Sequence, residues 1–349
     1  MKNEVYEVSD WSELNYYNSW GTRSKKILAN PSGDIYYFKE SYNNGKGKHY
    51  KYEFYSEIIA SFIGEMSGLD ILDYSIAIHK ENIGCLSKSR ISNDEELIEG
   101  GKYLKAFDNT FIMDQEKPKE KYTFQLIMNA FKSFSLESNI DKLIDIIIFD
   151  AIIGNSDRHQ ENWGFIAKST SFSNAFSEVE KTIAGQTSKY ENLINNITRI
   201  FNLQKIIKQI TPHEISRIKL TLKREIRFAP IYDSGCSLGR ELTEDRANNV
   251  LSDIESLDAY ISKGQAEIYW DGIKYKHFDL LKLLFETDAK IKERAKEVAA
   301  KVNIDSLQEF VYALDQKLPV KFEQYKIPKH RKDLVIKLIT LRKQKILEL

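Results

Sequence analysis

The sequence predicts an α+β fold of two lobes, a small strand-rich N-terminal lobe and a larger, mainly helical C-terminal lobe. Segments rich in β-branched and aromatic residues are concentrated in about the first 105 residues. From about residue 120 onward, apolar residues recur with the spacing of amphipathic helices. Only 6 prolines and 16 glycines occur in 349 residues, which favours helix. We therefore expect an N-lobe over residues 1–105 and a helical C-lobe over residues 106–349, with a ligand between them.

The composition is that of an ordinary globular protein. The 51 basic and 51 acidic residues cancel, so the overall charge favours neither nucleic acid nor an anionic membrane as partner. The two cysteines, Cys85 and Cys236, are too few for a disulfide framework or a multi-cysteine zinc site. The N-terminal stretch lacks the apolar core of a signal peptide, and no apolar run has the length of a membrane span. We expect a cytoplasmic protein without a membrane partner, and direct nucleic-acid binding is not expected.

The N-lobe elements follow in the order strand, helix, hairpin. The segment "DIYYFKES" (34–41) follows the turn-like "NPSG" and predicts a strand. The segment "KYEFYSEIIASFIGEMSG" (51–68) has apolar residues at helical spacing and a glycine at its end, so it predicts a helix. The segments "YSIAIHK" and "IGCLSKS" are separated by only a few residues and predict a hairpin.

The C-lobe begins with two strongly predicted helices, "YTFQLIMNAFKSF" and "NIDKLIDIIIFDAII". The second helix breaks abruptly into the polar segment "GNSDRHQENWGF" (154–165). A helical insertion is predicted over about 167–228, whose basic residues we interpret as a solvated helix face because acidic residues are interleaved with them. The segment 229–237, within "FAPIYDSGCSLGREL", interrupts the helical pattern once more, and helices fill the remainder.

The polar segment 154–165 has the spacing that phosphoryl transfer requires. That reaction needs a carboxylate at the attacking hydroxyl, oxygen ligands for Mg²⁺ and a cation on the phosphates. Protein kinases supply the carboxylate and one metal ligand from a loop with the spacing D-x-x-x-x-N, which Asp157 and Asn162 match. Asp233, after a short apolar run and before Ser-Gly, is the candidate second ligand.

The cation and its partner are sought in the N-lobe. Lys39 in "IYYFKE" is the candidate phosphate lysine, and Glu57 on the following helix is its expected partner, with Glu53 one turn earlier as the alternative. The segment "WGTRSKKIL" (20–28) precedes the lysine strand and could cover the phosphates through the backbone at Gly21 and the side chains of Arg23 and Lys25.

Each of these residues has an ordinary structural interpretation as well. Asp157 and Asp233 could be turn residues, and Lys39 could be a solvated charge. His159 is better suited to orienting the loop by hydrogen bonds than to acting as a base. The order of the features along the chain, from phosphate loop to strand-borne aspartate, favours the functional interpretation.

At these residues the chain resembles the HipA-like serine/threonine kinases of bacteria. "GNSDRHQENWGF" is similar to that family's catalytic loop, and "WGTRSKK" with "YYFKES" is similar to its phosphate loop and lysine strand. "YSEIIASFIGEMSGLDILDY", "IYDSGCSLG" and "KGQAEIYWDGIKYKHFDLL" also resemble family segments. The similarity is scattered over roughly residues 20–281.

The resemblance implies a protein-kinase-like fold, ATP, Mg²⁺ and a protein substrate phosphorylated on Ser or Thr. It makes Asp157 the catalytic carboxylate and Asn162 and Asp233 the metal ligands. The implied ATP-binding residues are Gly21, Thr22, Arg23, Ser24, Lys25, Lys39, Glu57 and His159. Some family members are toxins held by a DNA-binding antitoxin, which makes such a protein a candidate partner. Some also autophosphorylate a serine near the phosphate loop, where this chain offers Ser19, Thr22 and Ser24.

The chain departs from eukaryotic kinases, since it lacks their G-x-G-x-x-G-x-V loop, Asp-Phe-Gly and Ala-Pro-Glu. The long insertion after Asn162 leaves regulation and substrate docking open. Two other functions also remain open. One is a phosphotransferase acting on a small molecule, and the other is a nucleotide-sensing binding module without activity. A degenerate kinase commonly lacks a polar ligand, whereas this sequence supplies each one expected.

Overall fold

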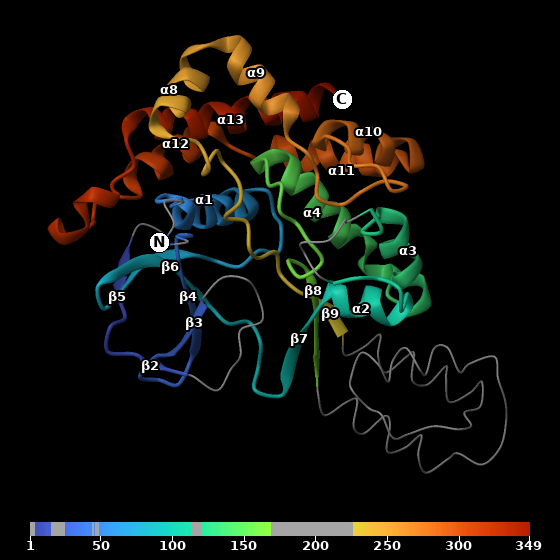
Figure 1. Ribbon diagram of the computed structural model, residues 1–349, viewed down its shortest axis with the longest axis horizontal. Helices are drawn as coiled ribbons and strands as arrows, with labels where there is room; N and C mark the ends of the chain where they lie inside the picture. Colours follow the sequence, from blue (N-terminus) through green and yellow to red (C-terminus); the bar gives the residue numbers. More distant parts are fainter. Residues whose placement is uncertain (1–3, 15–24, 44, 46–48, 114–119, 169–225) are drawn as a thin grey trace.

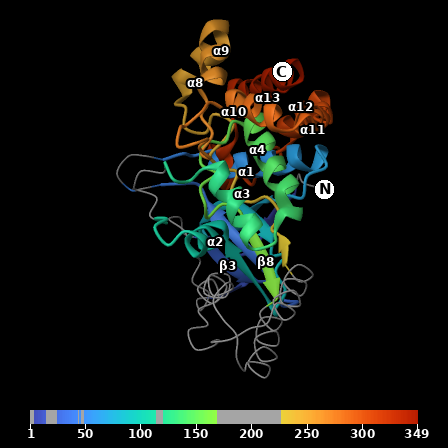
Figure 2. The same ribbon diagram turned by 90° about the vertical axis from the view of Figure 1, so that its right-hand side faces the viewer.

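The computed structural model describes residues 4–14, 25–43, 45, 49–113, 120–168 and 226–349. Strands gather at one end of the molecule and the C-terminal helices at the other, with helices α1 and α4 between them (Figures 1 and 2). The predicted α+β architecture, strand-rich first and mainly helical afterwards, is confirmed. Among the described helices, none is both long enough and apolar enough to cross a membrane.

A six-stranded sheet forms most of the N-terminal part, with the strand order β1-β5-β6-β4-β3-β2. Its neighbours pair antiparallel, except that β1 runs parallel to β5. The predicted lysine strand and the predicted hairpin are both confirmed, as β4 and as the pair β5–β6. The strands are β1 (Val5–Glu7), β2 (Ser12–Glu13), β3 (Lys25–Ala29), β4 (Ile35–Glu40), β5 (Ser75–His79) and β6 (Asn82–Lys88).

Helix α1 (Glu53–Met66) crosses from this sheet to the helical part, and it confirms the helix predicted over 51–68. It is buried around most of its circumference, because β5 and β6 contact one side of it and α12 contacts another. After its last turn, Gly68 adopts a left-handed φ of 72°, the conformation in which glycine commonly ends a helix.

The helical part is organised around α4 (Ile140–Ile153), which α10, α11 and α13 contact. Helices α3 (Phe124–Ser133) and α4 confirm the two strong helix predictions. Because α4 is apolar on nearly every face, it can only be stable inside a bundle. The other described helices are α2 (Gly100–Phe107), α8 (Glu244–Ser252), α9 (Ile254–Lys263), α10 (His277–Thr287), α11 (Ala289–Ala300), α12 (Ile304–Ala313) and α13 (Lys329–Glu348), with short 3₁₀ turns at Glu137–Asn139 and Val320–Tyr325.

A second, three-stranded sheet joins the two parts, with β7 (Glu95–Glu99), β8 (Gly164–Lys168) and β9 (Ile226–Phe228) in that order. The insertion predicted over about 167–228 is bounded by two of these strands. Its first residues belong to β8 and its last to β9, and these two strands pair with each other. Phe165 packs against Phe228 across this pair, and the contact stabilises the two strands. Residues 169–225, which carry the predicted helices, lie outside the described residues.

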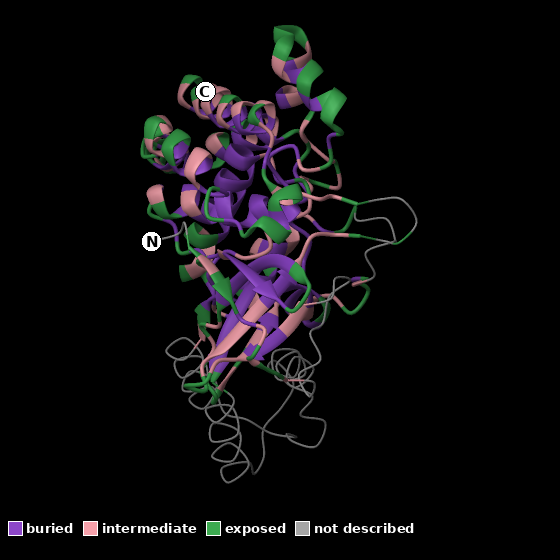
Figure 3. Ribbon diagram, turned by 90° about the vertical axis from the view of Figure 1, so that its left-hand side faces the viewer, coloured by how far each residue is buried: buried purple, intermediate pink, exposed green. Residues whose placement is uncertain are grey.

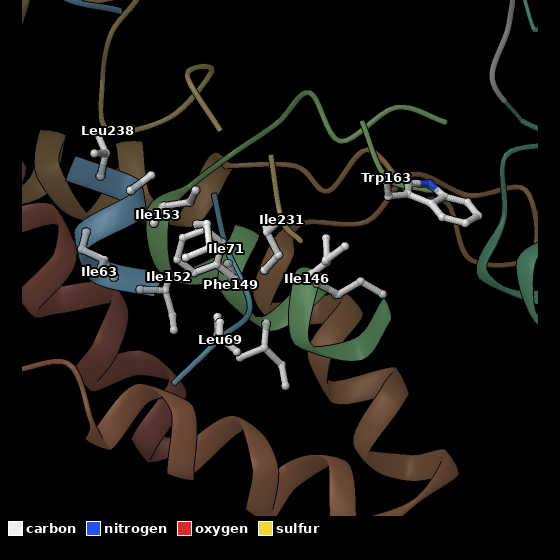
Figure 4. Close-up of a cluster of buried hydrophobic side chains, with 14 of the residues drawn as sticks. Ile63, Leu69, Ile71, Ile146, Phe149, Ile152, Ile153, Trp163, Ile231 and Leu238 are labelled. Atoms are coloured by element: carbon white, nitrogen blue, oxygen red, sulfur yellow. The ribbon is translucent and has the colours of Figure 1, made fainter. Parts of the chain in front are cut away.

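A continuous apolar core supports the segments that carry the candidate site. Figure 4 shows Ile71 and Phe149 of α4 in the middle of this cluster, with Ile63 of α1 and Ile152 of α4 on one side of them and Ile231 on the other. Ile231 pairs with Ile71 through a short parallel bridge, so the chain just before Asp233 is fixed against the core. Buried residues are concentrated in the interior, from the large sheet to the central helices, and exposed residues lie at the periphery (Figure 3).

Candidate functional site

The candidate catalytic loop, residues 154–165, leaves α4 through a glycine turn. Gly154 has a φ of 70° and forms the left-handed C-cap of the helix. The backbone N–H of Asn155 then donates to the Asp150 carbonyl at 3.0 Å. The side-chain oxygen of Asn155 accepts from the Asp157 N–H at 3.2 Å. This Asx turn directs the chain out of the helix and sets the position of Asp157.

Arg158, the residue after Asp157, fixes the loop from inside the protein. Its side chain is almost fully buried and forms a two-point ion pair with Asp150 on α4. The same guanidinium donates to the carbonyls of Asn162 and Tyr232 and, at 3.2 Å, to the Ser234 hydroxyl. Burial by itself would lower the pKa of Arg158, but the charge and hydrogen bonds of Asp150 raise that pKa above its usual value. One charged side chain thus connects α4, the loop and the segment of Asp233.

Asp157 and Asn162 lie at the two ends of a closed loop. The Asn162 side-chain nitrogen donates to the Asp157 carbonyl at 2.8 Å, and the Asn162 backbone N–H donates to the His159 carbonyl at 2.9 Å. Because this nitrogen faces the loop, the amide oxygen, which is the atom suited to a hard cation, points the other way.

On the opposite side of the site, Lys39 pairs with Glu57, and its Nζ also lies 2.5 Å from Oδ1 of Asp233. Lys39 and Glu57 are buried, and the second oxygen of Asp233 lies 3.8 Å from Nζ of Lys25 on β3. Of the two glutamates considered from the sequence, Glu57 is the one in contact with Lys39. Two lysines therefore converge on a single carboxylate, an arrangement that concentrates positive charge next to a candidate metal ligand.

Asp233 is held in an uncommon backbone conformation. Its φ is 55°, in the left-handed region that few residues other than glycine adopt. The next residue, Ser234, donates its backbone N–H to Oε2 of Glu57 at 2.8 Å. Glu57 thus bonds to Lys39 with one oxygen and to the Asp233 segment with the other. Such positions often occur where function requires a fixed orientation.

His159 is oriented toward its own loop. Its Nδ1 accepts from the backbone N–H of Glu161 at 3.3 Å, and the side chain is buried. Tyr232 packs nearby, and its hydroxyl donates to the Glu161 carbonyl at 2.9 Å. Burial raises the pKa of Tyr232 far above its usual value, so the phenol stays protonated and can donate. This geometry fits a residue that orients the loop.

The candidate metal ligands are Asn162 and Asp233. Both provide oxygen, and Asp233 retains a partly accessible carboxylate beside two lysines. No cluster of three or more His, Cys, Asp or Glu suited to a metal ion occurs in the part of the chain that the structure describes. A site with few protein ligands suits Mg²⁺, which keeps several waters and is bound partly through substrate phosphates. The donor set therefore fits Mg²⁺ with a nucleotide.

The other predicted phosphate-loop residues, Gly21, Thr22, Arg23 and Ser24, lie outside the described residues, as does Ser19. Lys25 is the first described residue after them, and it faces Asp233.

The sequence prediction missed Asp150, Asn155, Cys236 and Arg240. Cys236 Sγ lies 3.0 Å from Oδ2 of Asp157 and accepts from Arg240. The buried ion pair could have been predicted from two features of the sequence, an aspartate near the end of an apolar helix and an arginine next to Asp157.

The comparisons with known proteins concern both sequence and fold. No protein-family model matches the chain. Over 155 residues it is 24% identical to the serine/threonine-protein kinase CtkA of Helicobacter pylori, and this match covers 43% of the chain and 46% of CtkA, less than half of either. The crystal structure of the Helicobacter pylori proinflammatory kinase CtkA aligns with a TM-score of 0.68 and 18% identity, covering 99% of this chain and 96% of that one. A complex of HipA, HipB and operator DNA from Shewanella oneidensis aligns with a TM-score of 0.43 and 11% identity, covering 97% of this chain and 62% of that one.

The alignment with CtkA establishes the fold over nearly the whole chain. The predicted bilobal, protein-kinase-like fold is confirmed, and the chain resembles the HipA-like kinases as its motifs indicate. Asp157, Asn162, Lys39, Glu57 and Asp233 are brought together by elements far apart in sequence. Their assigned roles remain predictions.

Proposed function

We propose that the chain is an ATP- and Mg²⁺-dependent serine/threonine protein kinase. The observation that carries the proposal is the contact of Lys39 with both Glu57 and Asp233. A lysine buried between two carboxylates has little structural benefit, since burying charges costs more than an apolar replacement would. The same three groups are the ones that phosphoryl transfer uses to hold a metal–polyphosphate.

In this proposal each described residue has one task. Asn162 and Asp233 would hold Mg²⁺, which would neutralise charge on the phosphate that is transferred. Lys39 and Lys25 orient the phosphate oxygens, and Glu57 keeps Lys39 in place. Asp157 accepts the proton of the acceptor hydroxyl, and the oxygen of that hydroxyl forms the new bond to phosphorus. The bond from phosphorus to the bridging oxygen of ATP breaks, and ADP leaves with that electron pair.

The test is incubation of the purified protein with Mg²⁺, γ-labelled ATP and a general protein substrate. We expect Asp157→Asn to keep the fold and nucleotide binding but to lose transfer by about 10²–10⁴-fold, because the group that accepts the proton is removed. The matched control is Asp305→Asn, which makes the same change at an exposed position on α12. We expect this control to transfer phosphate as the wild type does.

Mapping of the phosphate by mass spectrometry separates the alternatives. Label on Ser or Thr of the added protein, or of the chain itself, supports the kinase. Transfer to a sugar or alcohol, with none to protein, would indicate a small-molecule phosphotransferase. Nucleotide binding without any transfer would indicate a sensing module. Equal transfer by the wild type and Asp157→Asn would overturn the assignment of Asp157.

A further inference from the structure

Helix α1 carries a second buried glutamate, Glu53, one turn before Glu57. Its side chain is only 1% exposed and lies outside the Lys39 pair. Oε2 of Glu53 lies 3.6 Å from Nη1 of Arg240 and accepts the backbone N–H of Tyr42 at 3.0 Å. Burying a carboxylate is costly without a cation or hydrogen bonds beside it, and Arg240 is a cation in contact with Glu53.

Arg240 reaches from this glutamate to the catalytic loop. Its Nη2 donates to Cys236 Sγ at 3.0 Å, and the Cys236 thiol contacts Oδ2 of Asp157 at 3.0 Å. The guanidinium also lies over the ring of Tyr50, with its central carbon 4.2 Å from the ring centroid. Stacking of this kind favours one orientation of the guanidinium plane. A continuous chain of contacts therefore runs from Glu53 through Arg240 and Cys236 to Asp157.

We propose that Arg240 is a positioning residue that couples the placement of helix α1 to the catalytic carboxylate of Asp157 through Cys236. The proposal rests on the kinase function proposed above. In it, α1 controls both sides of the reaction. Glu57 places Lys39 on the phosphate-donor side, and Glu53 places Arg240 on the acceptor side.

The close fit of the intervening segment to α1 supports this coupling. A Cβ on Gly235 would lie 2.9 Å from Oε1 of Glu57 and 3.3 Å from Cγ of Glu53, so only glycine allows the segment to approach both glutamates. Ser56, between them on the helix, bonds its hydroxyl to the Ser237 carbonyl at 3.3 Å. Movement of α1 would therefore move the segment that carries Cys236.

The kinetic test compares Glu53→Gln, Arg240→Met and the double variant. We expect each single variant to lower kcat by about tenfold while the KM for ATP stays within about twofold, because the donor side is untouched. We expect the double variant to be no worse than either single variant, since all three interrupt one pathway. Arg246→Met, an exposed arginine on α8, is the matched control and should behave as the wild type does.

Two replacements of Cys236 test whether its thiol transmits the effect of Arg240 to Asp157. Cys236→Ser keeps a group that can both donate and accept, so we expect it to retain most of kcat, whereas Cys236→Ala should lose about as much as Arg240→Met. Multiplying effects in the double variant, or an unchanged kcat in Arg240→Met, would overturn the proposal.

A second measurement needs no catalysis and separates this inference from the proposed function. The reaction of Cys236 with a thiol reagent is followed by peptide mass, which distinguishes it from the fully buried Cys85. We expect Glu53→Gln to speed the labelling of Cys236 by about threefold or more in the wild-type background, because Arg240 without its charged partner holds the thiol less firmly. In the Arg240→Met background the same substitution should have no effect. An effect equal in both backgrounds refutes the coupling, even for a protein that transfers no phosphate.

Discussion

Arg158 and Asp150 form a two-point ion pair inside the protein, with Nε 3.0 Å from Oδ2 and Nη2 2.9 Å from Oδ1. Asp150 lies on the last turn of α4, and Arg158 lies next to Asp157 in the loop. The pair therefore connects the buried helix α4 to the loop that carries the candidate catalytic carboxylate.

Replacing Asp150 with asparagine should strongly destabilise the protein. The change leaves the Arg158 charge buried without its partner, which typically costs about 3–5 kcal/mol in the free energy of unfolding. Denaturant unfolding measures this loss. The matched variant is Asp145→Asn on the same helix, whose partner Arg294 is partly exposed and can be rehydrated. We expect a clearly smaller loss there, and equal losses would show that burial of Arg158 is not the cause.

Replacing Lys39 with methionine should strongly lower the rate of transfer. The change removes the cation from between Glu57 and Asp233, and loss of one electrostatic contact to the reacting group commonly lowers the rate by about 10²–10³-fold. Initial rates and calorimetric ATP binding measure the two effects. The control is Lys26→Met on β3, whose ammonium pairs with Glu40 nearer the surface. A Lys39→Met protein with normal rates would remove the central observation behind the proposed function.

Replacing Gly154 with alanine should destabilise the end of α4. A left-handed φ of 70° strains a residue with a side chain, and the new Cβ would lie 2.8 Å from the guanidinium carbon of Arg342. We expect a loss of about 1–3 kcal/mol in the free energy of unfolding. Gly33→Ala is the comparison, because Gly33 has a φ of 83° but no atom within 4 Å of its added Cβ. If both variants lose the same stability, contact with Arg342 contributes nothing.

His277 should make the protein less stable in mild acid. Its ring is buried, and neither ring nitrogen has a hydrogen-bond partner among the described residues. Burial, reinforced by the charges of Arg342 and Lys274, lowers the pKa of His277 from 6.5 to about 3. Below pH 6.5, His277 therefore binds a proton in the unfolded chain but stays neutral in the folded protein. The stability that the neutral ring provides is present above pH 6.5 and is lost as the pH falls toward 3.

The size of this effect can be measured by difference. Between pH 6.5 and 5 the contribution of His277 amounts to about 2 kcal/mol in the free energy of unfolding. We expect the loss between these pH values to be smaller by that amount in His277→Phe than in the wild type. His49→Gln, an exposed histidine, should retain the wild-type slope. A His277→Phe protein with an unchanged slope would contradict the assigned burial of a neutral ring.

The spacing of apolar residues along the chain correctly predicted most of the helices and strands that bury one continuous set of them. The lysine strand, helix α1, the hairpin and helices α3 and α4 follow from spacing of apolar residues, because each element buries one continuous set of them. Strands β8 and β9 do not follow from it. Their pairing joins residues on either side of a long segment, and the pairing of Phe165 with Phe228 is a tertiary contact with no local signal.

The sequence by itself determined which groups could do chemistry here: the D-x-x-x-x-N spacing, an aspartate before Ser-Gly, a strand lysine and a helix with two glutamates. Only the tertiary structure decided which of those glutamates pairs with Lys39. Glu57 does so, and Glu53 pairs with Arg240 instead. Both glutamates lie on one face of α1, so their spacing along the helix is equally suitable. The choice depends on the segment from Ser234 to Arg240, which lies against α1 only after β4, α4 and the apolar core have brought distant parts of the chain together.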